Sequence, residues 1–414
     1  MVLRKGWLLL LGLLGACGLP SPDQARKNLA PETPLTPEYR DIPLARIHLG
    51  VSDLYPLLFG ESENVRLFAV GEGEGQGRIR PGDVALEIGV PNFSLAFFVS
   101  ASELNRPVTK AITLPQIPGV NPRLQNLLEQ AQLPEAYLFQ TLTLTLPVGY
   151  VRARDIAVCL ESACSASFRE VSTGNTAFRF NTNAPVRVVA EASEFLNALG
   201  TRIFQGNVDV DLRLTPLADL GDLIDYVGQE GCGITGCNIR QNVTEAKVLA
   251  PFGARAPDPF VVETEALASP LGALPTATVE EVKRYTQEAG LTLEIASSLP
   301  TEVLEVTLWA GSGDTPRFDN PLPQDFLYTT AEPIPAASVD EEGRSTNSVK
   351  KTISVMLSGA ELQRFLGLLS QEDVHVAARL TLKGPDSTGG VFRYKASDAL
   401  RIFAKGTARL RIGR

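Results

Sequence analysis

The chain has 414 residues, a formal net charge of −9 at pH 7 and a hydrophobic fraction of 44%. Its length is sufficient for two or three domains, each with a hydrophobic core of its own. The acidic balance excludes nucleic acid and anionic lipid surfaces as the main partner, because both repel a negatively charged protein.

The first residues have the features of an export signal. Arg4 and Lys5 precede an apolar run over residues 7–14, which is shorter than the roughly 20 residues of a permanent membrane helix. A charged start, a short apolar stretch and small residues before a cleavage point are typical of signal peptides. The run ends in Leu-Gly-Ala-Cys at residues 14–17.

Residues 14–17 resemble the lipobox of bacterial lipoproteins, in which a small residue precedes an obligatory cysteine. In that family the cysteine thiol takes a diacylglycerol and the signal is cut just before it. The resemblance implies that residues 1–16 are a signal peptide and that Cys17 is the lipidated first residue of an exported, envelope-anchored protein. Position 18, directly after the cysteine, is Gly and not Asp. In lipoproteins of bacteria with two membranes, the absence of Asp at that position is associated with sorting to the outer membrane. An ordinary signal peptide that contains a cysteine by chance is the alternative.

Residues 17–43 are predicted to be the lipidated cysteine and an extended tether, because they combine many polar residues with frequent prolines. Loss of Arg4 and Lys5 with the signal leaves 36 basic residues against 47 acidic ones, a net charge of −11. No later segment is apolar over 18 residues, so the sequence predicts no membrane span after the signal.

Strand patterns dominate the chain after the tether. Alternating or continuous apolar runs of strand length, separated by Gly, Pro and Asn, occur at residues 84–90, 94–99, 142–146, 208–214, 291–295, 304–308 and 374–382. Short helices are predicted over residues 122–132, 192–204, 217–227, 279–289 and 359–370.

Two parts of the chain resemble each other. Residues 186–215 carry the patterns of a strand, a short helix and a second strand, and residues 353–381 carry the same order. The motifs Glu-x-x-x-x-Leu-Gly and Arg-Leu-Thr recur in step, about 166 residues apart. A pair of strand patterns precedes each unit, at residues 142–160 and 291–308. The alternative is that any two amphipathic β segments resemble each other to this degree.

The predicted fold is therefore mainly β, with two tandem β-sandwich-like domains, related by duplication if the repeat is real, and short crossover helices. The first domain spans residues 44–250 and the second residues 276–414. Residues 251–275, rich in Pro and Ala, are predicted to be the linker. Residues 44–138 have no counterpart in the second half, so they either add strands to the first domain or form a separate subdomain.

The four remaining cysteines form two close pairs, Cys159 with Cys164 and Cys232 with Cys237. An even number of cysteines in an exported protein predicts disulfides within each pair. A single zinc site built from both pairs is the alternative, since structural zinc tolerates similar spacings. No nearby histidine supports the zinc site.

The sequence predicts no catalytic, cofactor-binding or metal-binding residues. The mature chain has two histidines, His48 and His375, each in a strand pattern, and it has no Gly-x-Ser-x-Gly motif. The glycine-rich segment 71–77 lacks the spacing of a nucleotide-binding loop and is interpreted as a hairpin loop. An acidic loop offers oxygen ligands for calcium, but its spacing differs from an EF-hand and favours a solvated loop; its residues are Asp314, Asp319, Asn320 and Asp325.

These patterns favour a non-enzymatic envelope lipoprotein with a structural or binding role, whose partner is an unknown envelope protein or glycan. A carrier of a lipid or other apolar ligand is the alternative, because segments such as 94–99 and 360–369 contain enough apolar residues to line a cavity. A hydrolase of envelope polysaccharide or peptide is a second alternative, because a carboxylate pair leaves no local sequence pattern.

Overall fold

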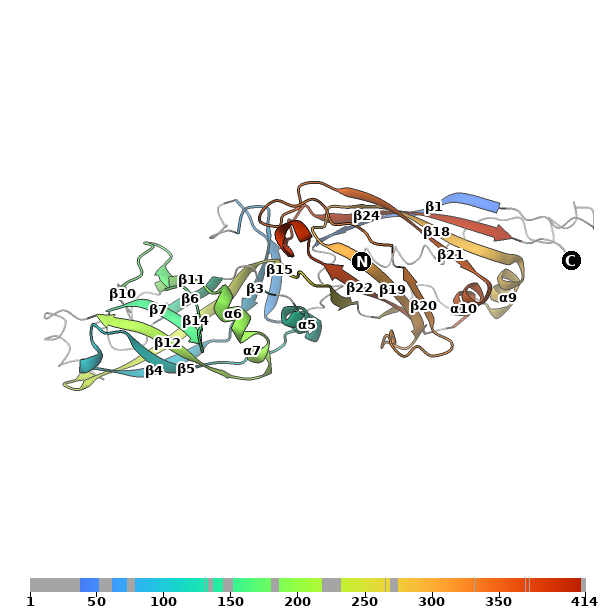
Figure 1. Ribbon diagram of the computed structural model, residues 1–414. Helices are drawn as coiled ribbons and strands as arrows, with labels where there is room; N and C mark the ends of the chain where they lie inside the picture. The colour runs from blue at the N-terminus through green and yellow to red at the C-terminus, as the bar shows by residue number, and fades with distance from the viewer. Residues whose placement is uncertain are drawn as a thin grey trace, which may run out of the picture. The chain divides into compact units, whose positions relative to one another are not determined.

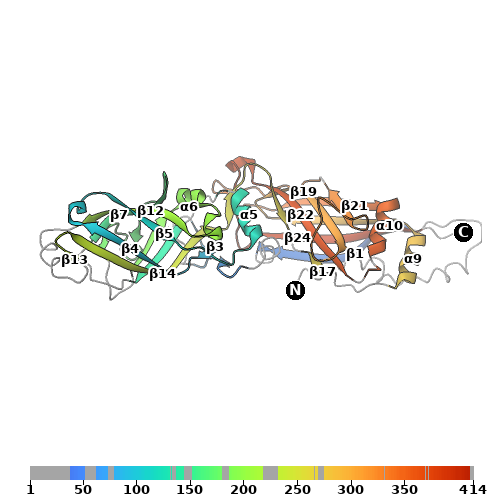
Figure 2. The same ribbon diagram turned by 90° about the horizontal axis from the view of Figure 1, so that it is seen from below.

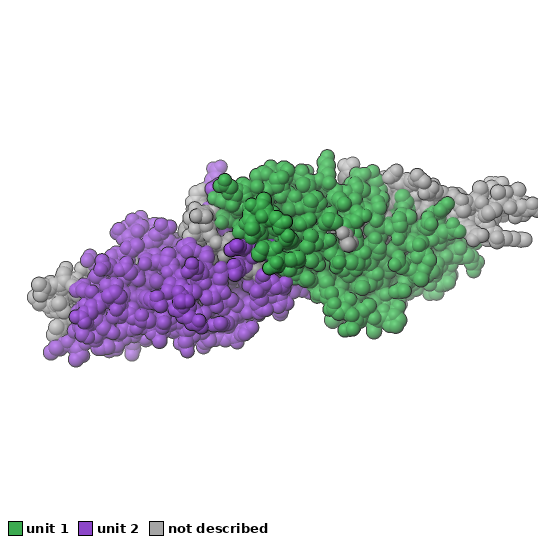
Figure 3. Space-filling view, in the orientation of Figure 1, with its two compact units in different colours: residues 1–60, 257–414 green, residues 61–256 purple. Residues whose placement is uncertain are grey.

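The chain divides into two compact units (Figure 3). Unit 1 is residues 1–60 with 257–414, and unit 2 is residues 61–256. Among the helices described in the computed structural model, none is long and apolar enough to cross a membrane. The described residues are 38–51, 62–72, 79–130, 132, 137–143, 152–179, 186–217, 232–264, 266–268, 275–330, 332–368, 370–371 and 373–410.

Among its described residues, unit 2 consists mainly of antiparallel strands with three short helices (Figure 1). The helices are α5 (Pro122–Gln130), α6 (Ser193–Leu199) and α7 (Arg202–Gln205), with a single 3-10 turn, η1 (Ala101–Glu103). The strands are β2 (Val65–Ala69), β3 (Val84–Gly89), β4 (Phe93–Ser100), β5 (Val108–Leu114), β6 (Tyr137–Thr143), β7 (Arg152–Leu160), β8 (Ala163–Cys164), β9 (Arg169–Glu170), β10 (Phe178–Arg179), β11 (Val186–Glu191), β12 (Val208–Leu217), β13 (Cys232–Gly233), β14 (Gly236–Pro251) and β15 (Gly253–Arg255).

Apart from β15, these strands form two sheets. The larger has the order β2-β3-β14-β6-β11-β9, with β4 and β13 also paired to β14. The second has the order β10-β7-β12-β5, with β8 paired to β7. In β12, Val210, Leu212 and Leu214 are buried, while Asp211 and Arg213 between them are half-buried and exposed, as the alternating sequence predicts.

Unit 1 has the same kind of architecture (Figure 2). Its helices are α9 (Thr276–Tyr285) and α10 (Gly359–Leu368), with a 3-10 turn, η2 (Asp386–Thr388). The strands are β1 (Glu38–Gly50), β16 (Phe260–Glu263), β17 (Leu267–Ala268), β18 (Thr286–Ser297), β19 (Glu302–Ser312), β20 (Phe326–Thr330), β21 (Val349–Ser358), β22 (Val374–Lys383), β23 (Val391–Arg393) and β24 (Ala399–Leu410). One sheet has the order β1-β24-β18-β21, and the other has the order β16-β22-β19-β20, with β17 also paired to β22.

The two units share one order of elements. The series β5-α5-β6-β7-β11-α6-β12-β14 of unit 2 corresponds along the chain to β16-α9-β18-β19-β21-α10-β22-β24 of unit 1. In space, the order β14-β6-β11 matches β24-β18-β21, and the order β5-β12-β7 matches β16-β22-β19, with every pair antiparallel. The repeat in the sequence therefore falls on elements with the same position in both units.

The core of unit 1 lies between its two sheets. Ile295 of β18 and Ile353 of β21 pack with Val303 of β19. At the other end, α10 inserts Leu362 and Leu366 among strands of both sheets. Unit 1 is therefore a sandwich with helices at one end, and the mainly β prediction is correct.

The structure differs from the predicted segment boundaries at three places. Residues 38–43, predicted as part of the tether, belong to β1, which pairs with β24 in unit 1 (Figures 1 and 2). Residues 260–268, predicted as linker, form β16 and β17, which pair with β22. Residues 44–50, predicted as part of the first domain, belong to the same strand β1 of unit 1. Residues 84–114 contribute β3, β4 and β5 to the two sheets of unit 2, which is one of the two outcomes predicted for residues 44–138. In each case the strand is fixed by a partner distant in sequence, which local patterns do not reveal.

Candidate functional site

The predicted sites are distributed over separate parts of the chain. Cys17 and its lipobox lie outside the described residues. His48 lies on β1 and His375 on β22, in different sheets of unit 1. The Nδ1 atom of His375 is 3.4 Å from a carboxylate oxygen of Asp373. Within the described ranges, no cluster of three or more His, Cys, Asp or Glu side chains could hold a metal ion.

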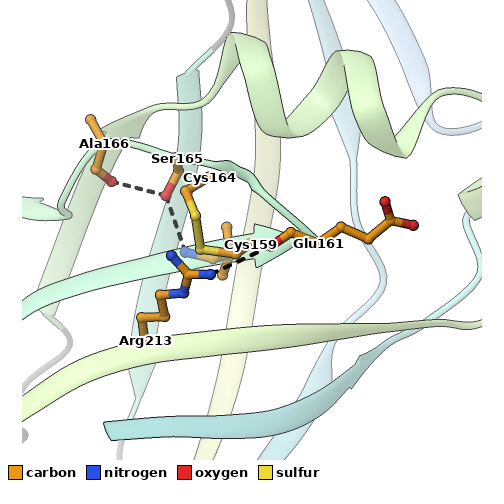
Figure 4. The surroundings of a disulfide bond; sticks show 7 residues. Cys159, Glu161, Cys164, Ser165, Ala166 and Arg213 are labelled. Atoms are coloured by element: carbon orange, nitrogen blue, oxygen red, sulfur yellow. Dashed lines mark hydrogen bonds between the residues drawn. A yellow bond between two sulfur atoms is a disulfide. The ribbon is translucent and has the colours of Figure 1, made fainter. Parts of the chain in front are cut away.

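Cys159 and Cys164 form a disulfide across the β7–β8 hairpin (Figure 4). Cys159 is fully buried. Beside it, the Ser165 hydroxyl donates to the Ala166 carbonyl at 2.9 Å and accepts from the Val158 amide at 3.1 Å. Arg213 of the neighbouring β12 donates to the Glu161 carbonyl at the turn. These hydrogen bonds from side chains to backbone groups attach the hairpin to the sheet. The role of the disulfide and its neighbours is therefore structural.

The second pair lies on a hairpin with the same spacing. Cys232 of β13 is directly opposite Cys237 of β14, and Cys237 is disulfide-bonded. The side chain of Cys232 lies outside the described residues, so its pairing stays a prediction. Because Cys159 and Cys164 are joined to each other, a zinc site built from both cysteine pairs does not form.

The acidic loop does not present free ligands for calcium. The Asp325 side chain is completely buried and accepts hydrogen bonds from Trp309, from the Leu322 amide and twice from Arg317. Burial opposes ionisation of this carboxyl, but the hydrogen bonds from Arg317 and the other donors outweigh it and lower its pKa. Asp319 accepts two hydrogen bonds from Arg379 at 2.7 and 2.8 Å. Both carboxylates are therefore occupied by arginines.

An apolar pocket lies in unit 2, between its two sheets and the three helices. Its walls include Ile88 of β3 and Val248 of β14 from the larger sheet, and Leu114 of β5 from the second sheet. Phe195 of α6 and Ile203 of α7 close it from the helical side. All five side chains are nearly inaccessible to solvent. The cavity has a volume of about 80 Å³.

The rim of this pocket is half-exposed and mostly apolar. It comprises Val90, Phe93, Leu128 of α5 and Leu196 of α6. Asn197, an exposed residue of α6, contributes the one polar side chain among the described lining residues. The described lining of the pocket therefore offers no charged group and no buried polar side chain with which to orient a polar ligand.

The sequence did not indicate these lining residues. Segment 94–99 lies in β4, and segment 360–369 is mostly α10 of unit 1, where Leu362 and Leu366 belong to a buried apolar cluster. Neither segment lines the pocket. The apolar positions of residues 193–204 were a usable signal, because a short amphipathic helix that crosses between two sheets places its apolar face between them.

Comparisons with known proteins give little further information. No protein-family model matches the chain, and no curated protein matches its sequence. Among solved structures, the chain is similar to a "putative secreted protein" from Parabacteroides distasonis, with 10% identity, 90% of this chain and 99% of that chain covered, and a TM-score of 0.42. It is also similar to the naturally empty top component of cowpea mosaic virus, with 8% identity, 78% and 91% coverage and a TM-score of 0.17. Both likenesses are too weak to assign a family, ligand or activity to this chain.

Proposed function

We propose that this chain is an exported lipoprotein, anchored to the cell envelope through a lipid on Cys17, with a non-enzymatic binding or structural role. The observation that carries the proposal is the Leu-Gly-Ala-Cys sequence at residues 14–17 after a short apolar run. A single acyl chain holds a protein only marginally on a membrane, whereas two or more hold it stably. If the source has two membranes, Gly18 favours the outer one.

The β13–β14 hairpin supports a binding role. Its turn places Ile234 in solvent with 84% of the side chain exposed, more than any other large apolar side chain among the described residues. Gly236 packs so closely against Val99 and Phe98 of β4 that a side chain there would collide with both. An exposed apolar residue on such a tightly held turn is suited to insert into an apolar site on a protein partner.

The size of the unit 2 pocket argues against a lipid carrier. Sites for drug-sized ligands occupy roughly 300–1,000 Å³. The volume of about 80 Å³ is well below that range and cannot enclose the two acyl chains of a membrane lipid. This pocket therefore gives no support to lipid transport.

The decisive test of the anchor is a Cys17→Ala variant expressed with the native signal in a bacterial host. The wild-type protein is expected in the membrane fraction, with an N-terminal peptide whose mass includes the diacylglycerol and an amide-linked acyl chain. The variant is expected to lack this added mass. An unmodified Cys17 in the wild-type peptide would refute the anchor, and density-gradient separation of the membranes would test the outer-membrane assignment.

The role of Ile234 is tested separately by a photoreactive amino acid placed at that position in intact cells. A binding surface predicts a crosslink to one recurrent envelope protein. The same amino acid at Val171, which is 44% exposed on unit 2, is the control. Equal crosslinking at both positions would remove the hairpin from the proposal.

A further inference from the structure

We infer that the apolar pocket of unit 2 is a binding site for a small uncharged molecule, with a single aromatic ring or a short alkyl chain. The inference does not rest on the lipid anchor, because all the lining residues lie in unit 2.

The helices beside the pocket have counterparts in unit 1 that belong to a buried apolar cluster. The helices α5 and α6 of unit 2 correspond in chain order to α9 and α10 of unit 1. In unit 1, Val279 of α9 packs with Leu362 and Leu366 of α10, and Phe365 contacts Phe326 edge-on at a centroid distance of 5.3 Å. In unit 1 the corresponding helices therefore pack directly against each other, whereas the described side chains of unit 2 leave a pocket.

The walls of the pocket are buried and apolar. Ile88, Leu114, Ile117 and Ile203 form a buried lining of aliphatic carbon. Cavities with such linings stay dry, and they bind apolar molecules the size of benzene. A ligand that enters would gain dispersion contacts on all sides without displacing hydrogen-bonded water.

The volume and the uncharged lining of the pocket limit the size and polarity of the ligand. A single water needs roughly 10–15 Å³ of such volume, so about 80 Å³ has room for a group of a few carbon atoms to one ring. A charged ligand would lose its hydration without a compensating partner.

The entrance lies between α5 and α6, where Leu128 and Leu196 are half-exposed. A larger side chain at position 196 has room to turn into the cavity and occupy it. Leu196→Trp is therefore the variant that blocks the site, and Val90→Trp on the opposite rim is a second blocking variant. Val171→Trp, on an exposed position of the same unit, is the matched control.

The experiment uses the chain from residue 17 with Cys17→Ala, so that no detergent competes for the probe. Toluene is titrated against protein labelled at isoleucine methyl groups and followed by NMR. We expect saturable shifts of the Ile88, Ile117 and Ile203 methyl signals, and no such shifts with benzoate. In Leu196→Trp the affinity is expected to fall at least about tenfold, while Val171→Trp leaves it unchanged.

The absence of saturable shifts in these three methyl groups would overturn the inference. So would toluene binding that both blocking variants leave unchanged, or equal binding of benzoate. Circular dichroism of each variant shows whether the fold is retained. If Leu196→Trp fails to fold, Val90→Trp supplies the same comparison.

Discussion

Arg317 and Asp325 form a two-point ion pair in unit 1, with Nε and Nη2 of the arginine each 2.9 Å from a carboxylate oxygen. The guanidinium also lies over the ring of Trp309, 5.2 Å from its centroid, while the indole N–H donates to Asp325. Three side chains thereby close the loop between β19 and β20 over the sheet. Paired charges that are buried in this way are costly to separate, because each is left without its partner.

Removal of the carboxylate should destabilise unit 1 strongly. In Asp325→Ala the buried Trp309 N–H and the Arg317 guanidinium lose their acceptor, and we expect a loss of about 3 kcal/mol in the free energy of unfolding. Trp309 is the sole tryptophan after residue 7, so its fluorescence during urea unfolding reports on unit 1. Asp314→Ala, in the exposed part of the same loop, is the control and should change stability little.

The same pair should give unit 1 an acid-dependent stability. The pKa of Asp325 is lowered in the folded state, so its contribution is fully present above the unfolded value of about 3.9 and is lost as the pH falls through the folded pKa. Each additional proton bound on unfolding changes stability by about 1.4 kcal/mol per pH unit. Urea unfolding of Asp325→Asn, followed through Trp309, should therefore depend less on pH below 4 than that of the wild type. Identical slopes would show that Asp325 does not titrate on unfolding.

The cysteines should be oxidised in pairs in the exported protein. Mass spectrometry of peptides prepared without reductant is expected to show Cys159 joined to Cys164 and Cys232 joined to Cys237. Each bond closes a small loop, so replacing Cys159 and Cys164 together by alanine should cost on the order of 2–3 kcal/mol at most. A mixed pairing, or bound zinc, would contradict this prediction.

Each strand pattern found in the sequence overlaps a strand of the structure, because alternation between apolar and polar residues decides which face is buried. The pattern over residues 208–214 gives β12, and the pattern over residues 374–382 gives β22. Helix ends were less accurate. The helix predicted at 279–289 ends at Tyr285, because residues from Thr286 onward pair with β21 and β24 as β18.

Local patterns could not predict the pairing of β1 with β24. They could not predict the pocket of unit 2 either. Pro43 argues against a strand, but β1 is an edge strand with irregular register at Pro43, where a missing amide donor is tolerated. Its partner β24 is more than three hundred residues away in the sequence. The pocket depends on side chains from both sheets and three helices, so no segment contains its pattern.

Two glycines of unit 1 allow the cost of backbone strain to be distinguished from the cost of steric contact. Gly343 and Gly389 have positive φ angles of 83° and 62°, which L-residues adopt at a cost of roughly 1–2 kcal/mol. A Cβ on Gly343 would lie 2.6 Å from the Val391 carbonyl and 2.8 Å from the Cα of Phe392, whereas a Cβ on Gly389 meets nothing within 4 Å. Gly389→Ala should therefore cost about 1 kcal/mol and Gly343→Ala about 3 kcal/mol or more, because the Gly343 carbonyl also accepts the Arg393 amide at 2.9 Å and the backbone there cannot shift freely. Urea unfolding followed through Trp309 measures both losses, and equal values would mean that the close approach at Gly343 does not constrain the chain.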